Sequence, residues 1–91
     1  MREYAGEIGG LEVAGPAAYR VIFDGGIIDN IGFGDTDKDL NGARFLVLDG
    51  AAKGRWVYVA EYRVCHGGGY IELEAPIEGL EVGDKYVVVG W

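Results

Sequence analysis

The chain lacks serine and glutamine altogether, and its 91 residues include one threonine, two asparagines, one methionine and one cysteine. Proteins of hyperthermophiles are depleted in the thermolabile residues Asn, Gln, Cys and Met. The composition therefore suggests a thermophilic source. A melting temperature below about 60 °C would contradict this hypothesis, because mesophilic domains cluster there. The missing serine does not follow from that chemistry.

The single cysteine, Cys65, excludes an internal disulfide. Its neighbour His66 is the one histidine of the chain, so the sequence offers neither a zinc-ligand set nor a Cys–His pair with a third orienting group. Neighbouring residues on a strand also point to opposite faces. We therefore expect structural roles for both residues, with no catalytic residue, no cofactor and no enzymatic activity.

Long apolar runs and basic runs are both missing. No segment approaches the ~18 apolar residues of a membrane span, and no basic-then-apolar leader opens the chain. The 15 acidic and 8 basic residues give a formal net charge of −7. We expect no membrane partner and no nucleic-acid partner. The negative charge is typical of a soluble surface, and a partner with a basic surface is the alternative.

The most polar stretch, residues 34–42, contains acidic side chains in alternation. They stand at Asp35, Asp37, Asp39 and Asn41, as at the start of a calcium-binding loop. Such a loop requires glycine at its sixth position and glutamate at its twelfth, where this chain has Leu40 and Leu46. The sequence favours a solvated acidic loop, so we expect no metal ligand, with a looser oxygen-ligand cation site as the alternative.

Short β-prone runs separated by glycines fill most of the chain, which is 49% hydrophobic and contains 17 glycines. The clearest runs cover residues 19–24, 27–33, 43–49, 55–64, 70–75 and 85–91. This spacing predicts an all-β fold, a small antiparallel β-barrel or sandwich of six to seven short strands, in one domain over residues 1–91. Gly9-Gly10 predicts a hairpin turn. The first 15 residues form either an ordered strand or an extended arm.

Several of these runs carry apolar residues on both faces. Residues 43–49 predict a strand that is buried on both sides. Alternation over residues 55–64 places Trp56, Tyr58 and Tyr62 on one face and Val57 and Val59 on the other. A domain of this size cannot cover so much apolar surface, and exposed apolar patches mark protein contacts. We therefore expect a homo-oligomer (a trimer is one option) or a subunit docked in a larger assembly. The candidate interface residues are Trp56, Val57, Tyr58, Val59, Tyr62 and Trp91.

From Leu40 onward the spacing of short motifs resembles a module of tailed-phage structural proteins. A Leu-x-Gly turn at residues 40–42 precedes an apolar strand that ends in a glycine turn, Phe45 to Gly50. Gly54 to Tyr62 then supplies a second glycine, a strand and a tyrosine. Ile71-Glu72-Leu73, a bend at Pro76, and Gly83-Asp84-Lys85-Tyr86 before the last valines complete the pattern.

This C-terminal half is similar to the β-rich proteins that decorate heads or build tails, fibres and adaptors in tailed bacteriophages. The resemblance implies a non-enzymatic virion protein, located in the virion after assembly in the host cytoplasm. A capsid decoration or cement subunit that clamps neighbouring capsid proteins is the preferred role, and a tail, fibre or head–tail adaptor subunit is the alternative. A carbohydrate-binding module that stacks a sugar on Trp56, Tyr58 and Tyr62 is the rival from another class.

Overall fold

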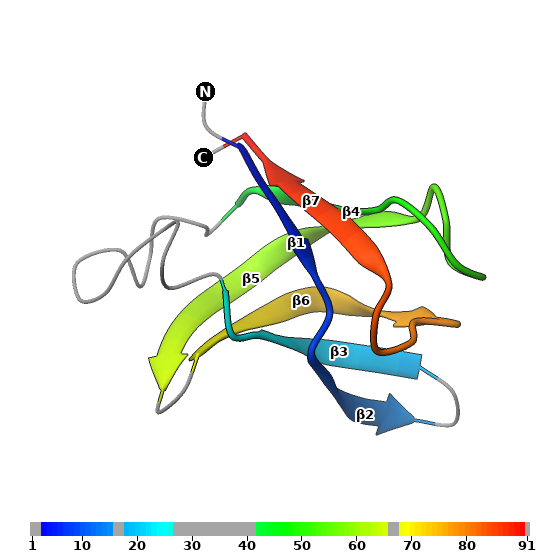
Figure 1. The fold of residues 1–91 in the computed structure, drawn as a ribbon, viewed down its shortest axis with the longest axis horizontal. Helices are drawn as coiled ribbons and strands as arrows, with labels where there is room; N and C mark the ends of the chain where they lie inside the picture. The colour runs from blue at the N-terminus through cyan, green and yellow to red at the C-terminus, as the bar shows by residue number, and fades with distance from the viewer. Residues whose placement is uncertain (1–2, 16–17, 27–41, 66–67, 91) are drawn as a thin grey trace.

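The computed structural model describes residues 3–15, 18–26, 42–65 and 68–90 of the chain (Figure 1). They form seven antiparallel strands and no helix, which confirms the predicted all-β class. The strands are β1 (Glu3–Glu7), β2 (Gly10–Gly15), β3 (Ala18–Asp24), β4 (Arg44–Val47), β5 (Trp56–Cys65), β6 (Gly68–Glu78) and β7 (Lys85–Val89). Their order in the sheet is β1-β7-β4-β5-β6-β3-β2, and the sheet curls into a half-barrel. The strand predicted over residues 27–33 lies outside the described residues.

The two edge strands are consecutive in the sequence, and the predicted hairpin turn at Gly9-Gly10 is wrong. Strand β1 pairs with β7, whereas β2 pairs with β3 on the other side of the curled sheet. Ile8 and Gly9 bridge the two, because the Ile8 N–H donates to the Asp84 carbonyl at 2.9 Å and the Gly9 N–H to the Phe23 carbonyl at 2.8 Å. Of the two alternatives for the first 15 residues, the described part from Glu3 onward forms ordered strands.

Strands β4 and β5 form a hairpin whose loop, residues 50–54, was predicted from its glycines. Gly50 and Gly54 adopt φ angles of 78° and 87°, in the left-handed region that favours glycine. Phe45 and Val47 of β4 are buried, but Leu46 is half-buried and Leu48 is 40% exposed. The prediction of burial on both sides is therefore wrong, because no described element covers the outer side of β4.

Strand β5 links the two halves of the curled sheet, and a bulge in its middle changes which face each residue takes. Its first residues pair with β4, and from Val59 onward it pairs with β6. The register shifts between Val59, opposite Leu73, and Glu61, opposite Glu72. The extra residue, Ala60, inverts the alternation, as β-bulges do. Val59 and Tyr62 consequently both face the core.

The concave side of the sheet encloses one hydrophobic core. Buried side chains from β1, β3, β4, β5, β6 and β7 and from the connections form it, and Leu11 of β2 packs against it, half-buried. Its largest fully buried members are Tyr62, Tyr86, Phe45, Ile8, Ile22, Ile71, Leu73, Leu80, Val47 and Val59. The rings of Phe45 and Tyr86 stack with centroids 4.8 Å apart. Two acidic side chains of the described residues are buried, those of Asp24 and Asp84. The Glu81 N–H donates to Asp84 Oδ2 at 3.0 Å.

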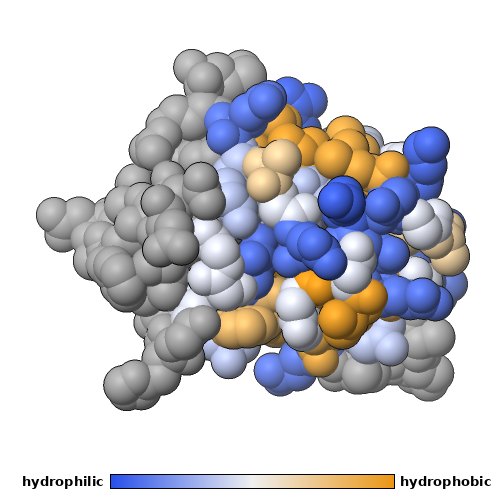
Figure 2. Space-filling view, in the orientation of Figure 1, coloured by the Kyte–Doolittle hydropathy of each residue, from blue (hydrophilic) through white to orange (hydrophobic). Residues whose placement is uncertain are grey.

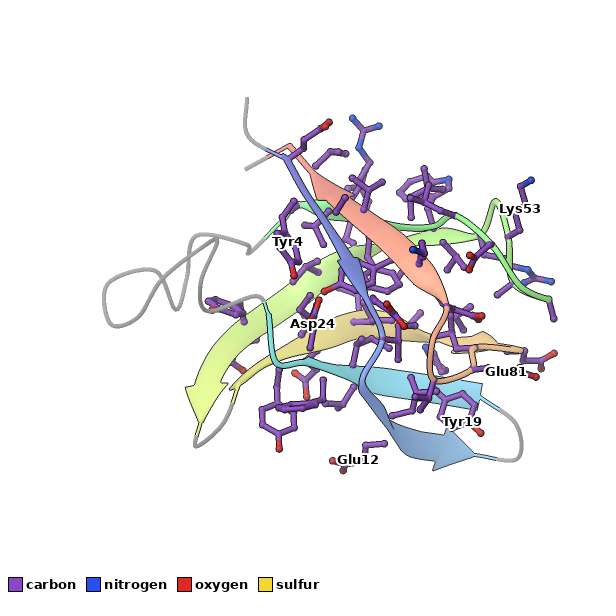
Figure 3. All side chains as sticks on the ribbon, in the orientation of Figure 1. Tyr4, Glu12, Tyr19, Asp24, Lys53 and Glu81 are labelled. Carbon is purple, nitrogen blue, oxygen red and sulfur yellow. The ribbon has the colours of Figure 1, made fainter. Side chains whose placement is uncertain are left out.

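The buried carboxylate of Asp24 ties three strands together (Figure 3). The hydroxyls of Tyr4 and Tyr86 donate to its Oδ2 at 2.8 and 2.7 Å, and the Gly26 N–H donates to its Oδ1 at 2.9 Å. Hydrogen bonds to an ionised acceptor are about twice as strong as neutral ones. The end of β3 is thereby joined to β1 and β7, which lie across the half-barrel from it.

Candidate functional site

The outer side of three adjacent strands carries three of the four exposed large hydrophobic side chains of the described residues, those of Leu48, Trp56 and Tyr58. Alternate residues of β7, β4 and β5, with Leu48 just after β4, point away from the core. We call this surface the β7–β4–β5 face, and it comprises Lys85, Val87, Val89, Arg44, Leu46, Leu48, Trp56 and Tyr58. Leu48 stays in register with β7 because its N–H donates to the Lys85 carbonyl at 2.8 Å.

The strand register aligns these side chains in rows across the sheet. One row contains Val87, Leu46 and Trp56, and it continues onto β1 at Ala5. The next row contains Val89, Arg44 and Tyr58 and continues at Glu3. Figure 2 shows hydrophobic surface gathered over the β7–β4 part of the molecule, bordered by hydrophilic residues. Six of the eight side chains of the face are apolar or aromatic, so the rows form a continuous apolar stripe.

Two aromatic side chains project from the β5 end of the face. Trp56 is 50% exposed and Tyr58 is 46% exposed. Their rings meet edge to face, with centroids 5.3 Å apart and an angle of 88° between the planes. This arrangement orders both rings while leaving them open to solvent. They are therefore positioned to bury large areas against a partner without a large loss of side-chain freedom.

Next to Trp56 the face is hollowed. The hollow has a volume of about 270 Å³ and is lined by Arg44, Leu46, Trp56 and Val89. Small-molecule sites are deeper cavities of roughly 300–1,000 Å³ with convergent polar groups. A shallow depression lined by one arginine and three apolar residues instead suits a protruding side chain of a partner protein.

The charges on the face differ from those of the chain as a whole. The net charge is −7, yet the eight side chains include two cations, Arg44 and Lys85, and no carboxylate. The nearest carboxylates in the strand register belong to the edge strand β1, at Glu3 and Glu7. Depletion of acidic residues with enrichment of Trp, Tyr and Arg is the composition of protein-interface cores.

The structure divides the predicted interface residues. Trp56 and Tyr58 lie on the exposed face, and Val57 lies on the opposite side of β5, half-buried against the core. Val59 and Tyr62 are 1% and 0% exposed. Their assignment to a contact surface is corrected, because the bulge at Ala60 turns them inward. Trp91 lies outside the described residues.

A three-ring stacking platform does not form. Tyr62 is buried in the core, on the other side of the sheet from Trp56 and Tyr58. The remaining two rings are perpendicular and present no common flat surface to a sugar. The predicted grouping of the three aromatics on one face is therefore wrong, since it assumed unbroken alternation along β5.

Sequence reasoning missed six members of the face: Arg44, Leu46, Leu48, Lys85, Val87 and Val89. The signal was present, because the runs 45–48 and 86–89 are apolar at both even and odd positions. Local sequence patterns do not show that β4 and β7 are neighbours in the sheet. The structure places Leu46 opposite Val87 and Arg44 opposite Val89. This pairing joins residues about 40 positions apart into one surface.

The remaining sites considered from the sequence are outside the described residues or lack partners within them. Asp35, Asp37, Asp39 and His66 lie outside that part of the chain. Within it, no three His, Cys, Asp or Glu side chains are grouped closely enough to hold a metal ion. The same residues contain no helix with the length and hydropathy to cross a membrane. No family model, curated protein or solved structure matches this chain.

Proposed function

We propose that this protein is a non-enzymatic structural subunit that works by docking its β7–β4–β5 face against another protein. The observation that carries the proposal is the apolar stripe of Val87, Leu46 and Trp56, which no described element covers. Contiguous apolar patches on soluble proteins mark sites of protein contact. The perpendicular rings of Trp56 and Tyr58 are the natural anchors, because Trp and Tyr dominate interface energetics.

The specific role that we propose is that of a virion protein, a capsid decoration or cement subunit in preference to a tail, fibre or adaptor subunit. Support comes from the resemblance of the C-terminal half to tailed-phage structural proteins. Its motif segments fall on β4, the loop at 50–54, β5, β6 and β7, which include the three strands of the face. A clamp of this kind needs a rigid sheet with an apolar outer side and requires no catalytic group.

Substitution of the aromatic anchor tests the docking. Trp56→Ala is expected to weaken binding to the partner by about thirtyfold or more, because interface hot spots cost ≥ ~2 kcal/mol when truncated. Val82→Ala is the matched control: Val82 is 63% exposed but lies in the β6–β7 connection, away from the face. Binding is measured by co-sedimentation of purified chain with capsids and tails, together with the particle mass with and without the chain.

Three results of these experiments would contradict the proposal or favour its alternative. If the chain stays monomeric and binds neither capsids nor tail parts, the virion role is wrong. If Trp56→Ala leaves all protein binding unchanged, the docking face is wrong. Saturable quenching of Trp56 fluorescence by glycans, with no protein binding, would favour the carbohydrate-binding alternative.

A further inference from the structure

The β7–β4–β5 face carries a protrusion and a hollow side by side. Trp56 projects from the start of β5 and is 50% exposed. The hollow beside it, about 270 Å³ in volume, is lined by Arg44 and Leu46 of β4, by Val89 of β7 and by the indole itself. The three strands lie next to one another in the sheet (Figure 1). A two-fold rotation about an axis that runs roughly along the strands, between β4 and β5, exchanges the protrusion and the hollow.

We infer that the occupant of this hollow is Trp56 of a second copy of this chain, which receives Trp56 of the first copy in the same way. The inference rests on the proposed function, because it takes the β7–β4–β5 face to be a protein contact, and it names the partner. In a two-fold contact both copies use the same surface, so every favourable contact forms twice. A face that offers both the inserted side chain and the hollow that receives it meets this requirement.

The lining of the hollow suits an indole. Leu46 and Val89 are half-buried aliphatic walls, and an indole that enters between them exchanges water for an apolar surface. Arg44 lines the same hollow, and a guanidinium is attracted to the face of an aromatic ring, most strongly to that of Trp. Trp56 loses little freedom on insertion, because Tyr58 already contacts its ring edge to face with centroids 5.3 Å apart.

The local charge allows two copies to meet here although each has a net charge of −7. The strand register adds Glu3 and Glu7 of β1 to the rows that contain Arg44 and Lys85, and Glu7 is the direct cross-strand partner of Lys85. Two carboxylates and two cations make these rows neutral, so the excess negative charge of each copy lies elsewhere on the chain. A partner selected by charge would require a strongly cationic or anionic face, which these rows do not provide.

Self-association of this kind has a characteristic salt dependence. Insertion of an indole into a largely apolar hollow does not depend on ion pairs between the copies. Added salt screens the repulsion between two chains that each carry a net charge of −7. Dimerisation is therefore expected to be unchanged or stronger when the salt concentration is raised from about 0.05 to 0.5 M. A partner held by ion pairs would dissociate over the same range.

Two variants that each lack one half of the contact test the inference. Trp56→Ala removes the inserted side chain, and Val89→Trp fills the hollow while Trp56 stays in place. Each variant alone is expected to sediment as the 9.8 kDa monomer where the wild type forms a dimer. Its dimer dissociation constant is expected to rise about thirtyfold or more. An equimolar mixture is expected to recover a heterodimer of intermediate affinity, because Trp56 of the Val89→Trp variant enters the open hollow of the other chain.

Matched substitutions at an exposed valine control for the loss and the gain of an aromatic side chain. Val82 is 63% exposed in the β6–β7 connection, away from the face. Val82→Ala and Val82→Trp are both expected to associate as the wild type does. Circular dichroism verifies that every variant is folded, and Leu46→Trp, which also fills the hollow, replaces Val89→Trp if the latter is not.

Four results would overturn the inference. They are a wild type that is monomeric at about 0.5 mM, unchanged dimerisation of Trp56→Ala, a mixture that stays monomeric, and dimerisation that weakens as salt is added. The proposed function fails separately. If dimers form as expected but the chain binds neither capsids nor tail parts, the virion role is wrong and the contact between copies stands. If Trp56→Ala weakens binding to capsids or tails while the wild type alone is monomeric, the face docks a different protein and only the second copy is excluded.

Discussion

Asp24 shows how a single residue can hold the curled sheet in shape. Its carboxylate is 6% exposed and accepts hydrogen bonds from the hydroxyls of Tyr4 and Tyr86 and from the Gly26 N–H. The backbone of Gly6 lies so close that a Cβ there would collide with the carboxylate and come within 2.7 Å of the Tyr4 ring. Glycine at position 6 thus makes room for the network.

Asp24→Asn is expected to destabilise the fold by about 2–3 kcal/mol, because an amide nitrogen replaces an oxygen that accepts two hydroxyl donors. The free energy of unfolding in urea measures this loss. Asp49→Asn is the control: Asp49 accepts the Lys85 N–H at 2.8 Å in an exposed setting, and a change below about 1 kcal/mol is expected there. Equal effects of the two substitutions would show that the buried network contributes nothing special.

The same network predicts a loss of stability at alkaline pH. Burial, reinforced by the hydrogen bond to Asp24 and its charge, raises the pKa of both Tyr4 and Tyr86 above the ordinary tyrosine value of about 10. Above pH 10 the unfolded chain releases these two protons while the folded chain retains them. The stabilisation is therefore complete below about pH 10 and falls as the pH rises further.

Urea unfolding between pH 9 and 11.5 measures the slope, with about 1.4 kcal/mol lost per pH unit for each retained proton. Tyr86→Phe removes one of the two tyrosines from the network, so its slope from this source is expected to be half as steep. Identical slopes for Tyr86→Phe and the wild type would contradict this account.

At the scale of the elements, β5 decides what the sheet presents to solvent. Before Ala60, its even-numbered residues Trp56 and Tyr58 point outward, and after Ala60 the even-numbered Tyr62 points inward. The bulge thus lets one continuous strand supply aromatics to an outer surface and to the core. It lies where β5 changes its pairing partner from β4 to β6, which is where a sheet must bend.

Deletion of Ala60 is expected to prevent stable folding. Without the extra residue, strict alternation must either bring Trp56 and Tyr58 into the core or turn Tyr62 out of it, at a cost of several kcal/mol. Circular dichroism and thermal unfolding measure the result. Insertion of one glycine after Lys53, in the exposed β4–β5 loop, is the control and is expected to be tolerated. A deletion variant that unfolds as the wild type does would refute the role of the bulge.

For the molecule as a whole, the asymmetry of its surface matters most. Arg44 and Lys85 stand within an apolar face, while Glu12, Glu61 and Glu72 line the outer side of the other half of the sheet. The net charge of −7 belongs to the whole chain and does not show how charges are distributed between these two surfaces. The apolar face lies on one half of the sheet only, which agrees with the docking role that we propose.

The thermal midpoint is expected to rise with protein concentration, because association of folded chains stabilises them by mass action. Differential scanning calorimetry over a hundredfold concentration range measures the effect, expected to be several degrees for a domain of this size. Trp56→Ala should flatten the dependence, and Val82→Ala should preserve it. A concentration-independent midpoint for the wild type would argue against self-association, and a midpoint below about 60 °C would contradict a thermophilic source.

The sequence by itself located strands β3 to β7 and several of the turns. Local alternation and glycines at positions such as Gly50 and Gly54 encode those features without help from distant residues. The excess of apolar residues at 45–48 and 86–89 likewise predicted an uncovered face, since a small domain has too little interior to hide them. The chain also offered no recognisable catalytic grouping.

Only the tertiary structure decided which residues form that face. Leu46 and Val87 become neighbours through pairing between distant strands, and the bulge at Ala60 moves Tyr62 from the expected surface into the core. The pairing of β1 with β7 and of β2 with β3, in place of a hairpin at Gly9-Gly10, was equally hidden. From the sequence, Asp24 is expected in a turn with Gly25 and Gly26. In the structure it is buried, and the hydroxyls of Tyr4 and Tyr86 donate to it from across the half-barrel. These features depend on long-range partners, which local alternation does not specify.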